Sequence, residues 1–273
     1  MKTDYVQRFL FEELDIRGRL VCLTGAWRRM IEGRAYPEPI AELLGHTAAL
    51  AVLLGANQKG KSRVTLQVQG SGPVRLLVAD CTSELKIRGM AQFTGAEGPL
   101  LGEGKLALTL EDIVSGQIYQ SLVPLKGETL AAIFEHYLAQ SEQLHAFLRL
   151  RADAGAVCGL LLEKLPGADA RDPDGWSRVT TLAATLRLAE TTGVQPYEIL
   201  TRLFPDELLR VFRLYPVAYH CPYDVENVKR VLRGLGRGEV EAILSEQGEV
   251  RIRNEMCNDE YRFDRAAVEQ LFA

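Results

Sequence analysis

Short segments in which apolar and polar residues alternate dominate the first 170 residues, and this period of two is typical of β-strands with one buried face. The expected strands cover residues 17–25, 63–70, 73–80, 83–93, 105–111, 117–125, 147–153 and 158–166. Two longer segments have apolar residues at helical spacing instead. One opens at Pro37 and runs to Gly55, and the other covers residues 127–144. This mixture predicts an α+β domain over residues 1–170.

The pattern changes after residue 166. Residues 167–176 are polar and rich in Gly and Pro, which indicates a boundary. Helices are expected at 177–191 and 196–204, whereas 206–219 fits a helix or a strand equally well. We therefore expect a helical linker over residues 171–217.

The last part of the chain, residues 218–273, predicts a small separate α+β domain. Asp224 can cap a helix, and a second helix should end at Gly248. Two alternating segments flank Cys257 and predict a hairpin with this cysteine at its tip. A last helix should start at Asp264.

Composition narrows the function without identifying it. The chain has 273 residues, of which 47% are hydrophobic and 25% charged, as expected for a globular protein. Its net charge of -4 argues against a broad nucleic-acid surface. The sequence has no charged-then-apolar leader and no apolar run near 20 residues, which predicts neither export nor a membrane span. Cys22, Cys81 and Cys158 lie in apolar stretches and are expected to be buried reduced thiols, in keeping with the cytoplasm.

One motif suggests a nucleotide site. Residues Gly55–Ser62 satisfy the phosphate-loop pattern G-x-x-x-x-G-K-[ST]. A working phosphate loop lies between a strand and a helix, because the helix N-terminus holds the phosphates. Here the expected order is helix, loop, strand. A P-loop hydrolase is therefore the alternative function, and a solvated turn is the preferred interpretation. The remaining residues show no catalytic constellation, so we do not expect an enzyme.

Cys221 and Cys257 stand out among the five cysteines because each lies in the context of a metal knuckle. A four-thiolate zinc site needs a CxC or CxxC pair on each side. Tyr223 stands where the second cysteine of a CxC would be, and Asn254 where the first of a CxxC would be. Asn258 follows Cys257 and tolerates the left-handed backbone that such turns need. The simpler interpretation, two small buried residues, stays open.

Taken together, several segments resemble the heat shock protein 33 family, the redox-regulated holdase chaperones of bacteria. The resemblance covers nearly the whole chain. It rests on RFLFEELDIRGRLV (8–21), the Tyr-Pro-x-Pro helix start (36–39), VTLQVQGSGPVRLLV (64–78), LKGETLAAIFEHYLAQSEQL (125–144) and EVEAILSEQGEVRIRNEMCNDEYRF (239–263). It implies a substrate-binding α+β domain, a helical linker and a C-terminal zinc domain. In that family four cysteines hold zinc, and oxidation to two disulfides releases the metal and unfolds the linker.

This chain keeps only two of those four cysteines, Cys221 and Cys257, which are the expected switch residues and the only thiolates left for a metal. Neither family-type disulfide can form, and we do not expect tight four-thiolate zinc, although His220, Asp259 or Glu260 could add weaker ligands. The one bond left between the two sites joins Cys221 to Cys257 and would lock the tail.

The resemblance thus implies an ATP-independent holdase with a cysteine-depleted switch, activated by heat or constitutively active. Its partners should be unfolding proteins rather than nucleic acid or membranes, and both a monomer and a homodimer stay open. A zinc-ribbon nucleic-acid module is disfavoured because the tail from residue 216 carries eight Lys or Arg against eleven Asp or Glu.

Overall fold

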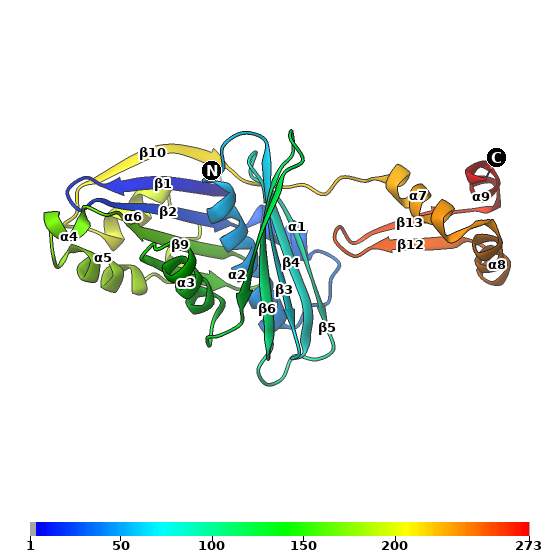
Figure 1. Ribbon diagram of the computed structural model, residues 1–273, viewed down its shortest axis with the longest axis horizontal. Coiled ribbons are helices and arrows are strands. Elements are labelled where there is room, and N and C mark those ends of the chain that lie inside the picture. Colours follow the sequence, from blue (N-terminus) through cyan, green and yellow to red (C-terminus); the bar gives the residue numbers. More distant parts are fainter. Residues whose placement is uncertain (1–3, 273) are drawn as a thin grey trace. The chain divides into compact units, whose positions relative to one another are not determined.

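The computed structural model describes residues 4–272, and its contacts divide the chain into two compact units (Figure 1). The first unit ends at His220 and the second begins at Cys221. The expected polar break at 167–176 therefore lies within the first unit, and so does the segment 171–217.

The first unit contains two sheets, in which all described strand pairs are antiparallel except that of β11 with β5. The five-stranded sheet has the order β10-β1-β2-β9-β8. Its strands are β1 (Tyr5–Phe11), β2 (Ile16–Leu23), β8 (Ala146–Ala152), β9 (Val157–Lys164) and β10 (Leu209–Pro216). The sequence analysis missed β1, whose residues are all buried or partly buried and show no clear alternation, and it also missed the short helix α1 (Gly25–Ile31).

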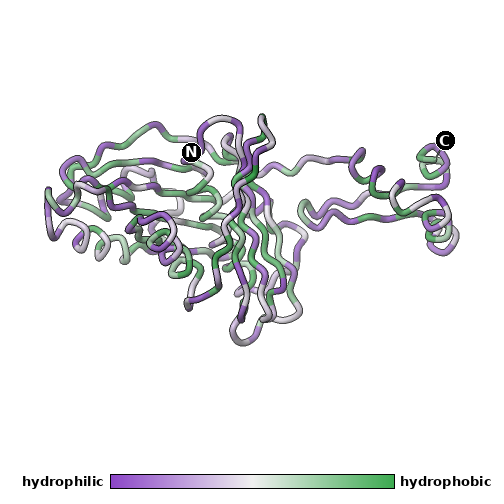
Figure 2. Tube along the Cα trace, in the orientation of Figure 1, coloured by the Kyte–Doolittle hydropathy of each residue, from purple (hydrophilic) through white to green (hydrophobic). Residues whose placement is uncertain are grey.

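The six-stranded sheet is mostly a meander of hairpins with the order β11-β5-β4-β3-β6-β7. Its strands are β3 (Ser62–Gly70), β4 (Val74–Thr82), β5 (Lys86–Phe93), β6 (Gly104–Asp112), β7 (Ile118–Pro124) and β11 (Ala218–Tyr219). Hydrophilic and hydrophobic residues alternate along these strands in Figure 2, as the sequence predicted. The two-residue strand β11 pairs parallel to β5 and directly follows β10, so residues 209–219 connect the two sheets.

Helix α2 (Glu38–Gly55) fills the space between the sheets and is the centre of the main core. Its residues are buried on nearly every side, which explains why the helix is apolar throughout. It is long and apolar enough to cross a membrane, but 67% of it is buried inside the protein, as expected of a core helix. Gly45 is required here because a Cβ would lie 2.5 Å from that of Ala152 on β8. Helix α3 (Leu130–Ser141) packs against β8 and buries Leu130, Ile133, Phe134, Tyr137 and Leu138.

The outer face of the five-stranded sheet has its own apolar core. Short helices cover it: α4 (Ala168–Arg171), α5 (Gly175–Ala184) and α6 (Pro196–Leu203), with a 3-10 turn at Leu188–Glu190. Helices were expected at 177–191 and 196–204, so the first one ends earlier than predicted. The ambiguous segment 206–219 is a strand, because β1 offers it a free edge in the sheet.

The second unit has the elements that the sequence predicted. They are α7 (Val225–Leu235), α8 (Arg237–Gln247), the hairpin β12 (Val250–Asn254) and β13 (Asp259–Phe263), and α9 (Arg265–Leu271). Asp224 caps α7, Asp264 caps α9, and Gly248 ends α8 in the left-handed conformation. Leu232, Val240 and Tyr261 lie at the centre of a small core of its own.

Candidate switch site in the C-terminal unit

The tip of the β12–β13 hairpin holds Cys257. Asn254 and Asp259 form the last strand pair, and the turn between them contains the cysteine. The side-chain Oδ1 of Asn254 accepts hydrogen bonds from the backbone N–H groups of Met256 (3.0 Å) and Cys257 (3.4 Å). Asn258 has a φ of 62°, the left-handed conformation expected for it from the sequence. Asn254 therefore stabilises the turn through its amide oxygen.

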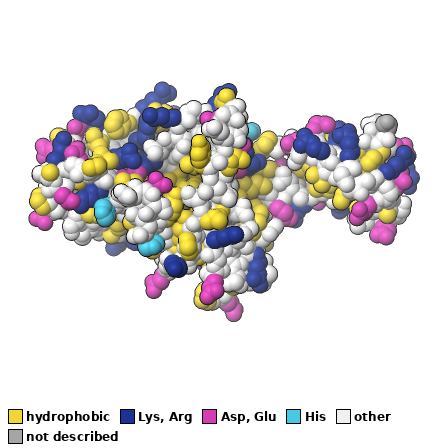
Figure 3. Space-filling view, in the orientation of Figure 1, with side chains coloured by type: hydrophobic (Ala, Val, Ile, Leu, Met, Phe, Trp, Pro, Cys, Tyr) yellow, Lys and Arg dark blue, Asp and Glu magenta, His cyan; other side chains and the backbone are white. Residues whose placement is uncertain are grey.

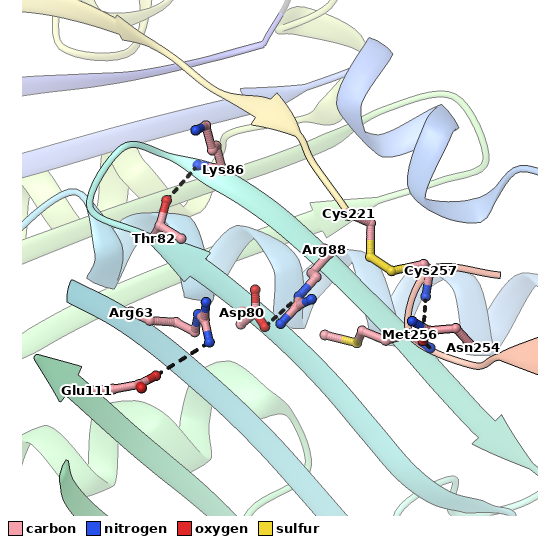
Figure 4. A network of polar contacts seen from close by, with 10 residues as sticks. All are labelled: Arg63, Asp80, Thr82, Lys86, Arg88, Glu111, Cys221, Asn254, Met256 and Cys257. Atoms are coloured by element: carbon pink, nitrogen blue, oxygen red, sulfur yellow. Dashed lines mark hydrogen bonds and ion pairs between the residues drawn. A yellow bond between two sulfur atoms is a disulfide. The ribbon is translucent and has the colours of Figure 1, made fainter. Parts of the chain in front are cut away.

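Cys221 lies just before α7 and is joined to Cys257 by a disulfide, with the Cα atoms 5.6 Å apart (Figure 4). Cys257 is buried, and Cys221 is partly so. The bond closes the 36-residue segment that contains α7, α8 and β12. It connects the start of the unit to the tip of its hairpin.

Tyr223 occupies the position of the second CxC cysteine and stacks on Tyr261 of β13. The two ring centroids are 4.5 Å apart and the planes are inclined by 15°. The hydroxyl of Tyr261 accepts a hydrogen bond from the backbone N–H of Asp224 at 3.0 Å. Tyr261 is fully buried, whereas Tyr223 is 63% exposed and covers one face of its partner. The sequence analysis missed Tyr261 as part of this site, because its alternation identified only a buried strand residue.

These residues do not fit a four-thiolate zinc site. The two remaining sulfurs are bonded to each other, Tyr223 is stacked, and the Asn254 oxygen accepts backbone hydrogen bonds. Of the weaker ligands considered, Glu260 pairs with Arg262 at 2.6 Å. Between residues 4 and 272, no three His, Cys, Asp or Glu side chains gather in a group able to hold a metal ion.

The local fold around the phosphate-loop motif argues against nucleotide binding. Helix α2 ends at Gly55 and β3 begins at Ser62, so the loop follows a helix and precedes a strand. The motif thus supplies no helix N-terminus for a phosphate.

Comparison with known proteins identifies the chain. The family model described as "Hsp33 protein" matches residues 4–264. The chain belongs to the Hsp33 family. It is 37% identical over 277 residues to the 33 kDa chaperonin of Methylobacillus flagellatus, an alignment that covers 99% of this chain and 94% of that protein. It is 39% identical over 276 residues to the 33 kDa chaperonin of Chromobacterium violaceum, with 98% and 94% covered.

The fold agrees with this membership. The crystal structure of the 33 kDa chaperonin from Thermotoga maritima, a heat shock protein 33 homolog, matches with a TM-score of 0.83 at 22% identity. The match covers 98% of this chain and 97% of that one. The predicted resemblance and the α+β fold class are thereby confirmed. Hsp33 proteins are chaperones, so the protein is a chaperone that binds other proteins.

The three remaining cysteines lie in the first unit. Cys22, Cys81 and Cys158 are free and buried, which confirms the prediction made from their apolar surroundings. The sequence did not reveal that the sulfur atoms of Cys22 and Cys158 are only 3.6 Å apart. The two residues are separated by 136 positions, and only strand pairing brings them together.

Proposed function

We propose that this Hsp33 protein is an ATP-independent holdase whose client-binding surface is the apolar face beneath α5 and α6. The main support is the composition of that face. Buried aromatic and aliphatic residues from β1, β2 and β9 form it: Tyr5, Phe9, Phe11, Ile16, Leu20, Leu160 and Leu162. Helices α5 and α6, here called the cover, lie over this face. If the cover detached, it would expose a continuous apolar sheet surface, to which unfolding chains bind through their own apolar residues.

The cover is built from short elements. Helices α5 and α6 have 10 and 8 residues, too few to be stable apart from the sheet. Phe204, just after α6, packs against Phe11 with ring centroids 5.0 Å apart and against Phe9 at 6.2 Å. The cover and the sheet therefore depend on each other, and the cover can detach as a unit.

Polar contacts add little to hold the cover closed. Arg178 of α5 pairs with Glu207 at 2.7 Å and with Asp172 at 2.9 Å. Arg178 is 43% exposed, so water and salt screen these pairs. The apolar contact is the main restraint, and heat is a suitable trigger for its release.

Client contacts are not limited to the covered face. Large apolar residues already lie exposed at the edge strand β7, among them Ile118, Tyr119 and Leu122. On the face drawn in Figure 3, hydrophobic side chains are interspersed with Lys, Arg, Asp and Glu, a surface on which an unfolded chain can find both kinds of contact. The exposed apolar residues of β7 could therefore bind clients weakly before the α5–α6 cover opens.

The C-terminal unit acts in this proposal as a heat-sensitive element without zinc. A disulfide and an aromatic stack replace the metal, and the unit has a small core of its own. A unit of this size has a low opening cost. We place the protein in the cytoplasm, with unfolding proteins as its partners and no role for nucleic acid.

Light scattering of a heat-labile client enzyme tests the holdase activity. The purified protein should suppress aggregation without nucleotide, and Lys61→Ala should suppress it equally well. Suppression that requires ATP, or that Lys61→Ala abolishes, would instead support the nucleotide-dependent alternative. A hydrophobic dye should bind more strongly at the temperature at which suppression begins, because the covered face becomes accessible.

A further inference from the structure

The close pair of sulfurs in the first unit has no part in the mechanism above. Cys22 of β2 and Cys158 of β9 are directly opposite each other in the antiparallel pairing of these strands. Both side chains point to the face beneath α5 and α6 and are buried, with 4% and 1% of each residue exposed. Their sulfur atoms lie 3.6 Å apart. The third cysteine of this unit, Cys81, lies on β4 in the other sheet.

The backbone already has the spacing that a disulfide needs. Opposite residues of antiparallel strands have Cα atoms about 4.5 or 5.5 Å apart. Disulfides form at Cα separations of about 4.4 to 6.8 Å. The sulfurs need to approach by roughly 1.5 Å to reach bonding distance, which a χ1 rotation at one or both residues can supply without moving the strands.

The surroundings shift the pKa values of the two thiols in opposite directions. The hydrogen bond with the Cys158 thiol lowers the pKa of Cys22, and the same interaction raises the pKa of Cys158. The Tyr5 hydroxyl also favours the Cys22 thiolate, whereas burial opposes it. One thiol is therefore disposed to be the nucleophile and the other to remain protonated until the second step.

A cavity gives small molecules a route to this pair. It has a volume of about 210 Å³ and is lined by Cys22, Tyr5 and Arg28 on one side and by the segment 191–195 on the other. This segment connects the 3-10 turn to α6. Peroxide is small and polar enough to enter, and Thr24, Thr191 and Gln195 supply polar lining.

We propose that Cys22 and Cys158 are a second redox site, which peroxide converts into an intramolecular disulfide independently of the C-terminal unit. The Cys22 thiolate attacks one oxygen of hydrogen peroxide, the O–O bond breaks, and Cys22 becomes a sulfenic acid as hydroxide leaves and is protonated to water. The Cys158 thiol then attacks the sulfenic sulfur, and a second water leaves. In total two thiols lose two electrons, one peroxide gains them, and two waters form. The product ties β2 to β9 beneath the cover helices.

Peptide mapping of the native protein tests the assignment. The double variant Cys221→Ser/Cys257→Ser, which leaves only the three cysteines of the first unit, is treated with hydrogen peroxide at doses that leave its circular dichroism unchanged. It is then denatured in an alkylating agent and digested. The expected product is a linked pair of peptides containing Cys22 and Cys158, with Cys81 fully alkylated. Cys81 is the internal control: it is equally buried, burial raises its pKa, and its Sγ donates a hydrogen bond to the Thr82 carbonyl oxygen.

A single variant checks the order of the two steps. In Cys158→Ala the linked peptide must disappear, and Cys22 should accumulate as a sulfenic acid that a dimedone probe captures. The proposal is overturned if native protein forms no link, if the link appears only after denaturant is added, or if Cys22 reacts no faster than Cys81. Because the readout is a covalent bond, its failure would leave the holdase proposal untouched, and failure of holdase activity would leave the bond untouched.

Discussion

Tyr223 and Asn254 each make a contact that stabilises the C-terminal unit without a metal. Tyr223 covers Tyr261 with its ring, and Asn254 holds the hairpin turn through its amide oxygen. Both contacts stabilise the apo fold locally: an aromatic pair contributes about 0.5–1.5 kcal/mol, and a hydrogen bond about 1 kcal/mol. Tyr223 lies two residues after Cys221 and Asn254 three residues before Cys257, which is the spacing of a CxC and a CxxC pair.

We therefore expect Tyr223→Cys/Asn254→Cys to regain zinc binding. Under reducing conditions the four thiolates would form a CxC and a CxxC pair, the set that closes a structural zinc site. The measurement is the zinc content after dialysis against a mild chelator, with about one zinc per chain expected for the double variant. The wild type and each single variant are the controls and should lose their metal. Stoichiometric zinc in the wild type would contradict our description of the site.

His46 predicts a pH dependence of stability. Burial within α2 lowers its pKa from 6.5 to about 4, and Arg151 adds to the effect. Glu42 lies 3.6 Å away and would favour the protonated form, but desolvation outweighs this exposed partner. Because the folded pKa lies below the unfolded one, the unfolded chain binds the proton first as the pH falls. The contribution is complete above pH 6.5 and is lost progressively down to about pH 4.

The His46 contribution amounts to about 3 kcal/mol at most, since one pKa unit corresponds to about 1.4 kcal/mol. Urea unfolding of wild type and His46→Gln at pH 7 and pH 4.5 measures it. The stability of His46→Gln should fall less over this interval. His136→Gln, at an exposed position of α3, is the matched control and should follow the wild type. Equal pH slopes for wild type and His46→Gln would contradict the assignment.

At the scale of elements, the cover formed by α5 and α6 depends on a few apolar contacts. Phe204→Ala removes a fully buried ring that packs against Phe9 and Phe11. This substitution should lower the free energy of unfolding by about 3–5 kcal/mol. We expect client protection and dye binding to begin at a temperature lower by roughly 6–20 °C. Both are measured during a slow temperature ramp.

The control for this prediction lies on the same helix. Tyr197 of α6 is 56% exposed, so Tyr197→Ala should leave the onset temperature within the error of the measurement. If Phe204→Ala destabilised the protein without lowering the onset of protection, the face beneath the cover would not be the client-binding surface.

At the scale of the whole molecule, we expect the Cys221–Cys257 disulfide to make oxidation stabilise the C-terminal unit. Cys221–Cys257 closes a 36-residue loop, which stabilises the folded C-terminal unit by roughly 4 kcal/mol on the chain-entropy model. We therefore expect oxidation to keep this unit closed rather than to open it. Dithiothreitol should lower the midpoint of unfolding of the C-terminal unit, followed by calorimetry, to the value of Cys221→Ser/Cys257→Ser.

Chaperone activity should follow temperature rather than oxidant. Wild type and Cys221→Ser/Cys257→Ser are compared for client protection at moderate and raised temperature, with and without peroxide. Both should be activated by heat, and the double variant at a lower temperature. Cys22 and Cys158 are present in both proteins, so any effect of their oxidation on client protection is the same in the wild type and in the double variant. Strong activation of the wild type by peroxide that the double variant lacks would show that the C-terminal cysteines still operate an activating switch.

The sequence by itself determined most elements of the two units. Period-two alternation predicted strands such as β3 and the C-terminal hairpin, because a strand with one buried face alternates. Short apolar runs predicted β2 and β9, which are buried on both faces of the five-stranded sheet. Asp224, Gly248 and Asp264 indicated helix ends, because capping depends on neighbouring residues. The family and the loss of two cysteines were also readable from local motifs, as was the wrong context of the phosphate loop.

Only the tertiary structure determined the features that depend on residues far apart in the chain. Residues 206–219 fit a helix or a strand until β1 supplied a free edge to pair with β10. Tyr223 stacks on Tyr261, which lies 38 positions further along the chain. Cys22 and Cys158 are 136 positions apart and meet only through strand pairing. No local pattern encodes such pairings, because their free energy comes from burial and hydrogen bonding that exist only after the chain has folded.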